Sequence, residues 1–233
     1  MTWNPVPPHI KILQYTLYDL PVRRGDLPAF MADSFKLIEE NEKAFKGISD
    51  PLSLFHNRSH KYSGIQFGID DGTLSVRAYG EPEITALKIW WKLHRKKNGL
   101  KPANLLTQKE LYTLGFLPVL QTFKTARFLV NREKQRELSQ QLDTESVSKI
   151  LADYLVANFF PFFNHLGYRH DRAEREIVAN VLRVKRLPKP YTVFKGAKRQ
   201  AYDIVFETNL RLPRLFRMGE ATALGFGNVY RWK

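Results

Sequence analysis

The stretch Tyr62–Tyr79 reads YSGIQFGIDDGTLSVRAY, and it decides how the first half of the chain folds. Apolar residues with β-branched and aromatic members fill its two arms, Tyr62–Ile69 and Thr73–Tyr79. The triplet DDG at positions 70–72 lies between them, and an Asp-Gly pair between alternating runs is a strong signal for a β-hairpin. The stretch therefore predicts two neighbouring antiparallel strands.

The segments on either side of this hairpin complete an order of elements. His9–Tyr18 is rich in β-branched and aromatic residues, which favours a strand. Apolar residues recur every three or four positions from Leu27 to Ile38, so an amphipathic helix is expected there. A second helix is expected over Ile84–His94 with Gly99 as its stop, followed by a short strand over Leu111–Gly115. Strand, helix, strand, strand, helix, strand is the split βαβ, or ferredoxin-like, arrangement.

The second half of the chain restarts this type of pattern without repeating its sequence. A strand, a helix capped by Asp143 or Thr144, a further strand and a basic hairpin are expected in turn. Their positions are 119–130, 146–160, 177–184, and 191–194 with 200–208 around the basic turn 195–199. The sequence thus predicts an α+β protein of two tandem ferredoxin-like (RRM-like) domains, residues 1–115 and 116–233, ending in a glycine-rich loop.

Composition narrows the class of protein. The 233 residues are 43% hydrophobic, which is enough for a buried core, and the absence of Cys excludes disulfides, thiolate metal sites and cysteine nucleophiles. The opening residues, MTWNPVPPHIK, lack a basic start followed by an apolar run, and charged residues interrupt every long apolar stretch. We therefore expect neither a signal peptide nor a transmembrane helix, and a cytoplasmic protein.

Charge indicates the chemistry of the partner. The formal net charge is +14, and residues 181–233 hold 12 basic and 3 acidic residues. Such a field attracts polyanions, so the partner is expected to be nucleic acid or an anionic membrane surface. Solubility alone is the competing explanation, although small domains more often carry net charges of about 2–8.

Glycine is concentrated near the C-terminus, where residues 216–229 read FRMGEATALGFGNV. Glycine permits positive φ and close backbone approach, so backbone amides in such a loop can face a phosphate. The segment lacks the Lys-Ser/Thr of a P-loop, and neither nucleotide-binding fingerprint fits it. A terminal turn that requires small residues explains it equally well.

This ending, LxxLFxMGEATALGFGNVYRW after a basic hairpin, resembles that of the CRISPR-associated endoribonucleases that cut precursor CRISPR RNA within its repeats, the sixth Cas family. Those proteins have two ferredoxin-like domains in tandem and a loop with the pattern Gly-x-Gly, a spacer, then Gly-Phe-Gly. The matching positions are Gly219, Gly225, Phe226 and Gly227. Arg217 stands where the first glycine is expected, and Glu220 where a basic residue is frequent.

A second block, LFHNRSHKYSGIQF at residues 54–67, resembles one that the type I-B branch of the family carries between its first helix and second strand. His56 and Asn57 match directly, Arg58 replaces a second histidine, and His60 has no clear counterpart. The positions that match the following strand in residue type are Lys61, Tyr62, Ile65, Gln66 and Phe67.

The resemblance implies a metal-independent endoribonuclease without a cofactor, in which the 2′-hydroxyl of RNA is the nucleophile. A histidine with a pKa near 6.5 can remove or supply a proton at neutral pH, and a cation can stabilise the charged phosphorane. The expected catalytic residues are His56, as general acid or base, His60 as its partner, and Tyr62. Tyr62 is expected to orient the phosphate with Arg58 and Lys61. An idle loop histidine is the alternative, and it is stronger for His60.

The basic hairpin and the glycine-rich loop are expected to hold RNA, because basic residues interleave there with Tyr191 and Phe194. A solvated hairpin tip is the competing interpretation. The predicted RNA-binding residues are Arg58, Lys61, Arg186, Lys195, Lys198, Arg199, Gly219, Gly225, Phe226, Gly227 and Asn228. The resemblance further implies CRISPR repeat RNA as partner, with effector-complex subunits and a homodimer as further possibilities and no membrane.

Two other functions stay open on the sequence: a repeat-RNA-binding subunit that does not cleave, and a polyanion- or membrane-binding protein that binds through charge alone.

Other clusters of residues are weaker indications of a site. His165 and the His170-Asp171 pair suggest a metal or phosphohydrolase site, but no second set of ligands has usable spacing, so a helix end and a loop are expected. The carboxylate pair Asp70-Asp71 is explained by the turn.

Overall fold

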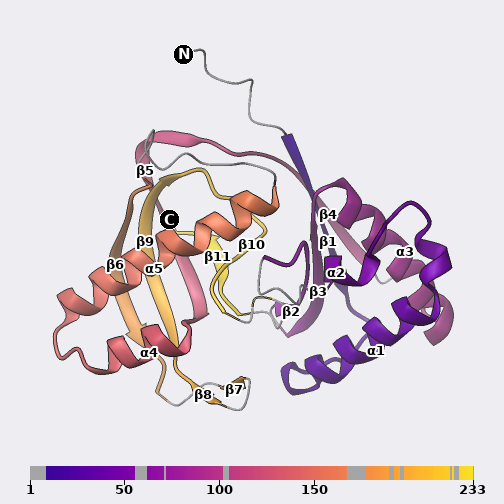
Figure 1. Cartoon of the computed structure of the whole chain (residues 1–233), viewed down its shortest axis with the longest axis horizontal. Helices are drawn as coiled ribbons and strands as arrows, with labels where there is room; N and C mark the ends of the chain where they lie inside the picture. Colours follow the sequence, from indigo (N-terminus) through magenta and orange to yellow (C-terminus); the bar gives the residue numbers. More distant parts are fainter. Residues whose placement is uncertain are drawn as a thin grey trace.

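The computed structural model describes residues 9–55, 62–70, 72–101, 105–166, 177–188, 192–194, 197–220, 222 and 226–232. Two antiparallel sheets dominate it, each with helices on one side, and they form the two lobes of Figure 1. The first sheet ends with a strand that stops at Thr113, and the second begins with a strand that starts at Phe116. The α+β tandem ferredoxin-like fold is thereby confirmed.

The first lobe contains the predicted order of elements. These are β1 (His9–Leu17), α1 (Leu27–Glu40), α2 (Pro51–Phe55), β2 (Ile65–Asp70), β3 (Thr73–Tyr79), α3 (Glu81–Asn98) and β4 (Leu105–Thr113), with short 3-10 turns at Arg24–Asp26 and Glu42–Phe45. The strands lie in the order β2-β3-β1-β4 and are antiparallel throughout. This is the strand order that a split βαβ unit produces.

Short sequence signals determine where several of these strands and helices begin or end. Asp70 is paired with Thr73 across the predicted turn. Helix α3 ends before Gly99, whose φ of 62° is the left-handed cap that the sequence indicated. Strand β4 begins six residues before the predicted start at Leu111 and ends at Thr113 and not at Gly115. It pairs along the whole of β1, from His9 opposite Thr113 to Leu17 opposite Leu105. Its outer part is mostly exposed and polar, so hydrophobic alternation gave no signal for it.

Both faces of the first sheet are covered. Along β3, Val76 packs into a core formed with α1, α2 and α3, whereas its neighbours Ser75 and Arg77 face the second lobe. Figure 1 shows the corresponding arrangement, with the three helices on one side of the sheet and β10 and β11 on the other. Because successive side chains of a strand point to opposite faces, one set of residues builds the first domain and the other joins it to the second.

The second lobe is a modified version of the same unit. Its elements are β5 (Phe116–Leu129), α4 (Arg132–Ser139), α5 (Thr144–His165), β6 (Ala179–Arg186), β7 (Thr192–Phe194), β8 (Ala197–Arg199), β9 (Ala201–Leu210), β10 (Phe216–Arg217) and β11 (Asn228–Arg231). The main sheet has the order β10-β11-β5-β9-β6. Where a ferredoxin-like unit has its second helix, the described part of residues 211–227 carries β10 and no helix.

The cap of α5 is confirmed, since the Asp143 carboxylate accepts a hydrogen bond from the Ser146 amide at 2.6 Å. One other expectation for this half is wrong. The described part of the expected first arm, Thr192–Phe194, does not pair with 200–208: β7 pairs with β8, while β9 lies between β5 and β6. The reason is that alternate residues of β9, such as Ile204 and Phe206, are fully buried in the main sheet. Helix α4 was not predicted at all.

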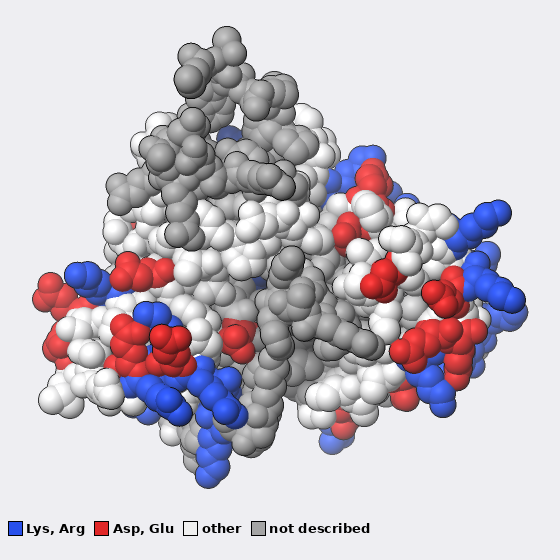
Figure 2. Space-filling model, viewed as in Figure 1, with Lys and Arg blue, Asp and Glu red and all other residues white. Residues whose placement is uncertain are grey.

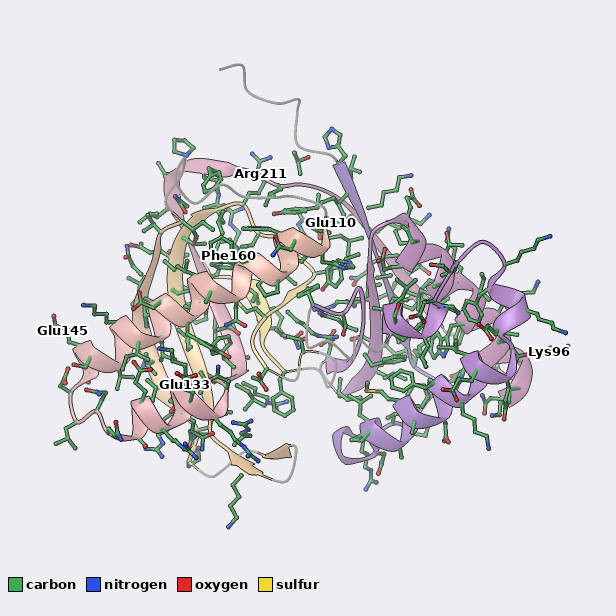
Figure 3. The ribbon with its side chains drawn as sticks, viewed as in Figure 1. Lys96, Glu110, Glu133, Glu145, Phe160 and Arg211 are labelled. Atoms are coloured by element: carbon green, nitrogen blue, oxygen red, sulfur yellow. The ribbon has the colours of Figure 1, made fainter. Side chains whose placement is uncertain are left out.

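One hydrophobic cluster spans both lobes. It contains Ile12 and Tyr79 of the first lobe together with Phe162 and Phe216 of the second. Polar contacts reinforce the junction: the Tyr112 hydroxyl donates to the Arg211 carbonyl at 2.6 Å. Glu110 and Arg211, labelled in Figure 3, mark where β4 and the segment after β9 meet. Among the described helices, none is long and apolar enough to cross a membrane.

Candidate nucleic-acid interface

The block with the predicted catalytic histidines is bounded by two buried aromatic residues. His56, Arg58, His60 and Lys61 lie outside the described residues, but Phe55 and Tyr62 on either side are described. Phe55 ends α2 and is fully buried in the core of the first lobe. Tyr62 belongs to the cluster that spans both lobes. The described residue before the block thus lies in the core of the first lobe, and the described residue after it lies at the junction between the lobes.

Tyr62 is 8% exposed and lies among aromatic rings from both lobes. Its ring centroid is 5.0 Å from that of Phe162 and 5.6 Å from that of Tyr79, and its hydroxyl donates to the carbonyl of Arg217 at 3.3 Å. Burial raises the pKa of Tyr62 well above 10, so the hydroxyl is protonated at neutral pH. Its role in orienting a phosphate stays a prediction. The structure describes Tyr62 as a contact between the residues just before β2 and strand β10.

Arg217, which replaces the first glycine of the family pattern, is at the centre of a buried charge cluster. Its side chain is 0% exposed, and Nη2 lies 3.1 Å from Asp70 Oδ1 and 2.8 Å from Ser75 Oγ. Arg77 Nη2 reaches the other oxygen of Asp70 at 2.7 Å. Asn228 completes the cluster, because its Oδ1 accepts from Arg217 Nε at 2.7 Å and its Nδ2 donates to Asp70 at 2.8 Å.

The electrostatics of this cluster follow from its composition. Burial by itself would raise the pKa of Asp70, but the guanidinium groups of Arg217 and Arg77 outweigh it and hold that pKa well below its usual range. Burial and the repulsion from Arg77 lower the pKa of Arg217, and Asp70 opposes this effect. One carboxylate thus serves two guanidinium groups from two different lobes, and Asp70 has a structural role that the turn alone did not predict.

The two described ends of the glycine-rich segment, residues 216–220 and 226–229, are hydrogen-bonded to each other. The Met218 amide donates to the Gly227 carbonyl at 3.0 Å, and the Glu220 amide donates to the Leu129 carbonyl at 3.0 Å. Gly227 has a φ of 69°, and a Cβ there would lie 1.7 Å from the Met218 carbonyl oxygen. Close backbone packing thus requires glycine here.

The structure places the predicted RNA-binding residues of this segment as follows. Gly219 has a φ of 93° and packs against Phe128. Phe226 is buried in a small cluster with Leu129. Both hydrogen-bonding ends of the Asn228 side chain are engaged within the charge cluster. Gly225 lies outside the described residues. Their contacts with RNA stay predictions.

The basic hairpin brings together some of the predicted residues. Arg186 ends β6, and Lys198 and Arg199 lie on β8, whereas Lys195 is outside the described residues. Arg186 and Lys198 are exposed, but Arg199 is 4% exposed. Two further arginines, Arg132 and Arg136 of α4, line the same cavity as these three and were missed. Their spacing of four residues in a charged segment was the available signal, because such residues share a helix face.

His165 ends α5 as expected, and its ring faces the first lobe. Its Nε2 lies 3.2 Å from the Tyr79 carbonyl and 3.4 Å from Glu83 Oε1. Burial raises the pKa of Glu83, and the neighbouring His165 opposes that rise. Within the described residues, no three His, Asp or Glu side chains come close enough to hold a metal ion.

No protein-family model matches the chain, and no curated protein matches it. Several solved structures are similar to it over nearly their whole length. The crystal structure of a CRISPR RNA processing endoribonuclease, Cas6b, has a TM-score of 0.67 at 17% identity and covers 97% of this chain and 100% of that one. A second Cas6b structure has a TM-score of 0.65 at 15% identity with the same coverage. Csf5, a type IV Cas6 crRNA endonuclease, has a TM-score of 0.56 at 11% identity over 97% of this chain and all 100% of its own.

The likeness extends over both lobes, because nearly the whole of each chain is covered. At such low identity it is evidence about the fold, and it agrees with the resemblance that the two sequence blocks carried. The chain therefore has the fold of the Cas6 CRISPR RNA-processing endoribonucleases.

Proposed function

We propose that this protein is a metal-independent endoribonuclease that cleaves CRISPR repeat RNA in precursor transcripts. The observation that carries the proposal is the Cas6b fold over 97% of the chain, in a sequence that holds both family-like blocks. The contact of the Tyr62 hydroxyl with the Arg217 carbonyl supports it, because it joins the end of the histidine block to the start of the glycine-rich segment. Tyr62, the described residue that follows the histidine block directly in the sequence, lies at the junction between the lobes.

The reaction needs only groups that RNA and this chain supply. The 2′-oxygen forms a bond to phosphorus and the bond from phosphorus to the 5′-oxygen breaks, which leaves a 2′,3′-cyclic phosphate and a 5′-hydroxyl. One histidine of the pair His56 and His60 takes the 2′-hydroxyl proton, and the other supplies a proton to the leaving 5′-oxygen. Arg58 and Lys61 are the proposed cations that stabilise the phosphorane.

The test is a cleavage gel with end-labelled repeat RNA in excess EDTA. One lane carries the same RNA with a 2′-deoxy sugar at the cut site, and another carries the His56→Ala protein. The matched control is His9→Ala, since His9 is an exposed histidine of β1 whose Nδ1 contacts Thr113 Oγ1 on β4. We expect one cut for the wild type and for His9→Ala, and none with the deoxy substitution or with His56→Ala.

Other outcomes distinguish the remaining functions. Cutting that survives His56→Ala would move the general acid or base to another residue, with His60 as the first to replace. Tight repeat-RNA binding without cutting at any protein excess would contradict the enzyme and leave an RNA-binding subunit of a CRISPR complex. Equal affinity for heparin, anionic vesicles and unrelated RNA would leave only attraction between charges. Effector-complex partners and a homodimer stay expectations.

A further inference from the structure

A cavity of about 440 Å³ opens between α4 and the base of the β7–β8 hairpin. Residues from α4, from the ends of β6 and β9, and from β8 form its walls. They are Arg132, Gln135, Arg136, Ser139, Arg186, Lys198, Arg199, Gln200 and Tyr202. Five of these nine residues are cationic and none is acidic. The described part of the chain thus builds a concave surface of one charge from elements far apart in the sequence.

Arg199 is the unusual member of this set. It is only 4% exposed, and its Nε and Nη1 atoms have no hydrogen-bond partner among the residues that the structure describes. A buried guanidinium whose N–H groups are unsatisfied destabilises the free protein, because their hydration is lost and nothing replaces it. Native structures keep few such groups, and a ligand that supplies the missing acceptor is a physical reason for one.

The walls of the cavity are held by neutral side chains. Gln135 of α4 donates from Nε2 to the Lys198 carbonyl at 3.3 Å and accepts from the Gln200 amide at 3.4 Å. Gln200 in turn donates from Nε2 to the Leu187 carbonyl at 2.7 Å and to that of Ala201 at 3.0 Å. These bonds join the helix, the hairpin and the residue after β6 without using the charged group of any cation of the cavity.

The exposed cations surround the cavity mouth. Arg136, Arg186 and Lys198 are exposed, and Figure 2 shows Lys and Arg at the lower left of the view, around the base of the hairpin, with acidic side chains of α4 beside them. The carboxylate of Glu137 on α4 is engaged elsewhere, in an ion pair of 2.6 Å with Lys134. An anion that approaches this mouth therefore meets several positive side chains before it reaches Arg199.

We propose that this cavity, called here the α4 pocket, binds a phosphate group of the RNA, with Arg199 as the direct contact at its base and Arg136 and Lys198 as contacts at its mouth. The inference rests on the proposed function in one respect, that the polyanion is RNA. Arginine suits the task because its planar donors match phosphate oxygens. The volume lies within the range of about 300–1,000 Å³ that is typical of ligand pockets, so a phosphate can enter with its sugar.

The α4 pocket is close to the glycine-rich segment. Phe226 of that segment packs with Leu129 and Ala201, and Leu187 packs against the same cluster. Leu187 and Ala201 also accept the hydrogen bonds of Gln200, which lines the pocket. A strand of RNA in the pocket would thus have the glycine-rich segment beside it.

The first test measures the affinity of repeat RNA for the full-length protein. The probe is fluorescent repeat RNA with 2′-O-methyl sugars throughout, which cannot be cleaved by 2′-hydroxyl attack. Arg136→Gln and Lys198→Gln are each expected to weaken binding about two- to fivefold, as for exposed ion pairs. Each is also expected to lower the slope of log affinity against log salt by about 0.7–0.9 between about 50 and 200 mM. The matched control, Lys96→Gln on α3, removes an exposed cation from the other lobe and should change neither value.

Arg199→Met gives a second readout that a structural role would not produce. Removing the unpartnered guanidinium should leave the melting temperature of the free protein unchanged or raise it, while RNA binding weakens about tenfold or more. A structural role for Arg199 predicts the opposite, a lower melting temperature. If Arg199→Met melts lower, the affinities of Arg136→Gln and Lys198→Gln still decide the proposal.

Two RNA probes identify the source of the phosphate. If 5′-hydroxyl and 5′-phosphorylated forms of the probe bind the wild type equally, and both lose affinity in the variants, the bound group is an internal phosphodiester. A loss confined to the phosphorylated form identifies a terminal phosphate. Wild-type affinity and salt slope in Arg136→Gln, Lys198→Gln and Arg199→Met together would overturn the α4 pocket even if repeat RNA is cleaved. A protein that never cleaves but shows these losses would refute the proposed enzyme and keep the pocket.

Discussion

The buried charge cluster makes a sharp prediction about Asp70→Asn. The substitution keeps the shape of the side chain and removes the carboxylate that Arg77 and Arg217 both contact. The side chains of these arginines are 6% and 0% exposed, so water cannot replace the lost charge. Breaking a buried ion pair by removing one partner costs about 3–5 kcal/mol. We expect Asp70→Asn to lower the free energy of unfolding by that amount.

Arg217→Met is the informative comparison, because it removes more hydrogen bonds but leaves the charges balanced. Asp70 keeps Arg77 at 2.7 Å, and Ser75 Oγ keeps its bond to Asp70 Oδ2 at 2.6 Å. Asn228 keeps Asp70 as an acceptor at 2.8 Å and Arg77 as a donor at 3.2 Å. With few groups left unsatisfied, the expected loss is about 1–3 kcal/mol.

The assay is urea-induced unfolding at neutral pH of the wild type, both single variants and the double variant. In a thermal melt of a chain of this size, each kcal/mol of lost stability would lower the melting temperature by about 2–4 °C. We expect Asp70→Asn to be the less stable single variant, and the double variant to lose less than the sum of the two. An Arg217→Met protein as unstable as Asp70→Asn would refute the argument from charge balance.

Three further predictions concern stability. Gly68→Ala should destabilise by about 1–3 kcal/mol in urea unfolding, because its Cβ would lie 2.3 Å from Nη2 of buried Arg217. Tyr112→Phe should cost about 0.5–1.5 kcal/mol by the same measurement, since it removes the bond to the Arg211 carbonyl. The folded-state pKa of Asp70 is lowered, so its contribution is present above its unfolded pKa of about 3.9 and is lost as pH falls below it. Unfolding measured from about pH 5 to pH 2 should show this loss in the wild type and not in Asp70→Asn.

Each of these predictions has a control. Gly25→Ala is expected to be neutral or slightly stabilising, because no described residue beyond its two chain neighbours comes within 4 Å of a Cβ there. Tyr18→Phe, at a side chain that is 60% exposed, should change the unfolding free energy by less than about 0.5 kcal/mol. Equal losses in test and control variants would contradict the assigned contacts. The same acid dependence in Asp70→Asn as in the wild type would remove Asp70 from the titration.

Much of the fold follows from local signals in the sequence. The DDG turn, the Asp143 cap and the Gly99 stop are each determined by a few neighbouring residues, and all three are present. Helix α4 was missed because REKQRELS buries a single side chain, Leu138, so hydrophobic periodicity is absent. The predicted partner of β7 was wrong. β9 pairs with β5 and β6 in the main sheet, and these partners lie far from it in the sequence, so β7 pairs with β8.

The candidate site is harder to derive, because the residues next to a charged residue in the sequence do not indicate whether its side chain is buried. Arg199 lies in a basic run, where exposure is the ordinary outcome, and Arg217 occupies a position where the family pattern has glycine. A β-turn already explains Asp70, so nothing in the sequence indicates its ion pairs with Arg77 and Arg217. These residues meet only after both sheets have formed, so their contacts belong to the tertiary structure.

The cluster shared by the two lobes has a consequence for synthesis of the protein. The first domain leaves the ribosome with one side of its sheet bare, because Phe162 and Phe216, which cover it, are made later. At about 5–20 residues per second, the remaining chain takes roughly 5–25 s to appear. During that interval Ile12 and Tyr79 stay open to water or to a chaperone. Fragments divided near residue 115 are therefore expected to accumulate in native form only when both are produced in the same cell.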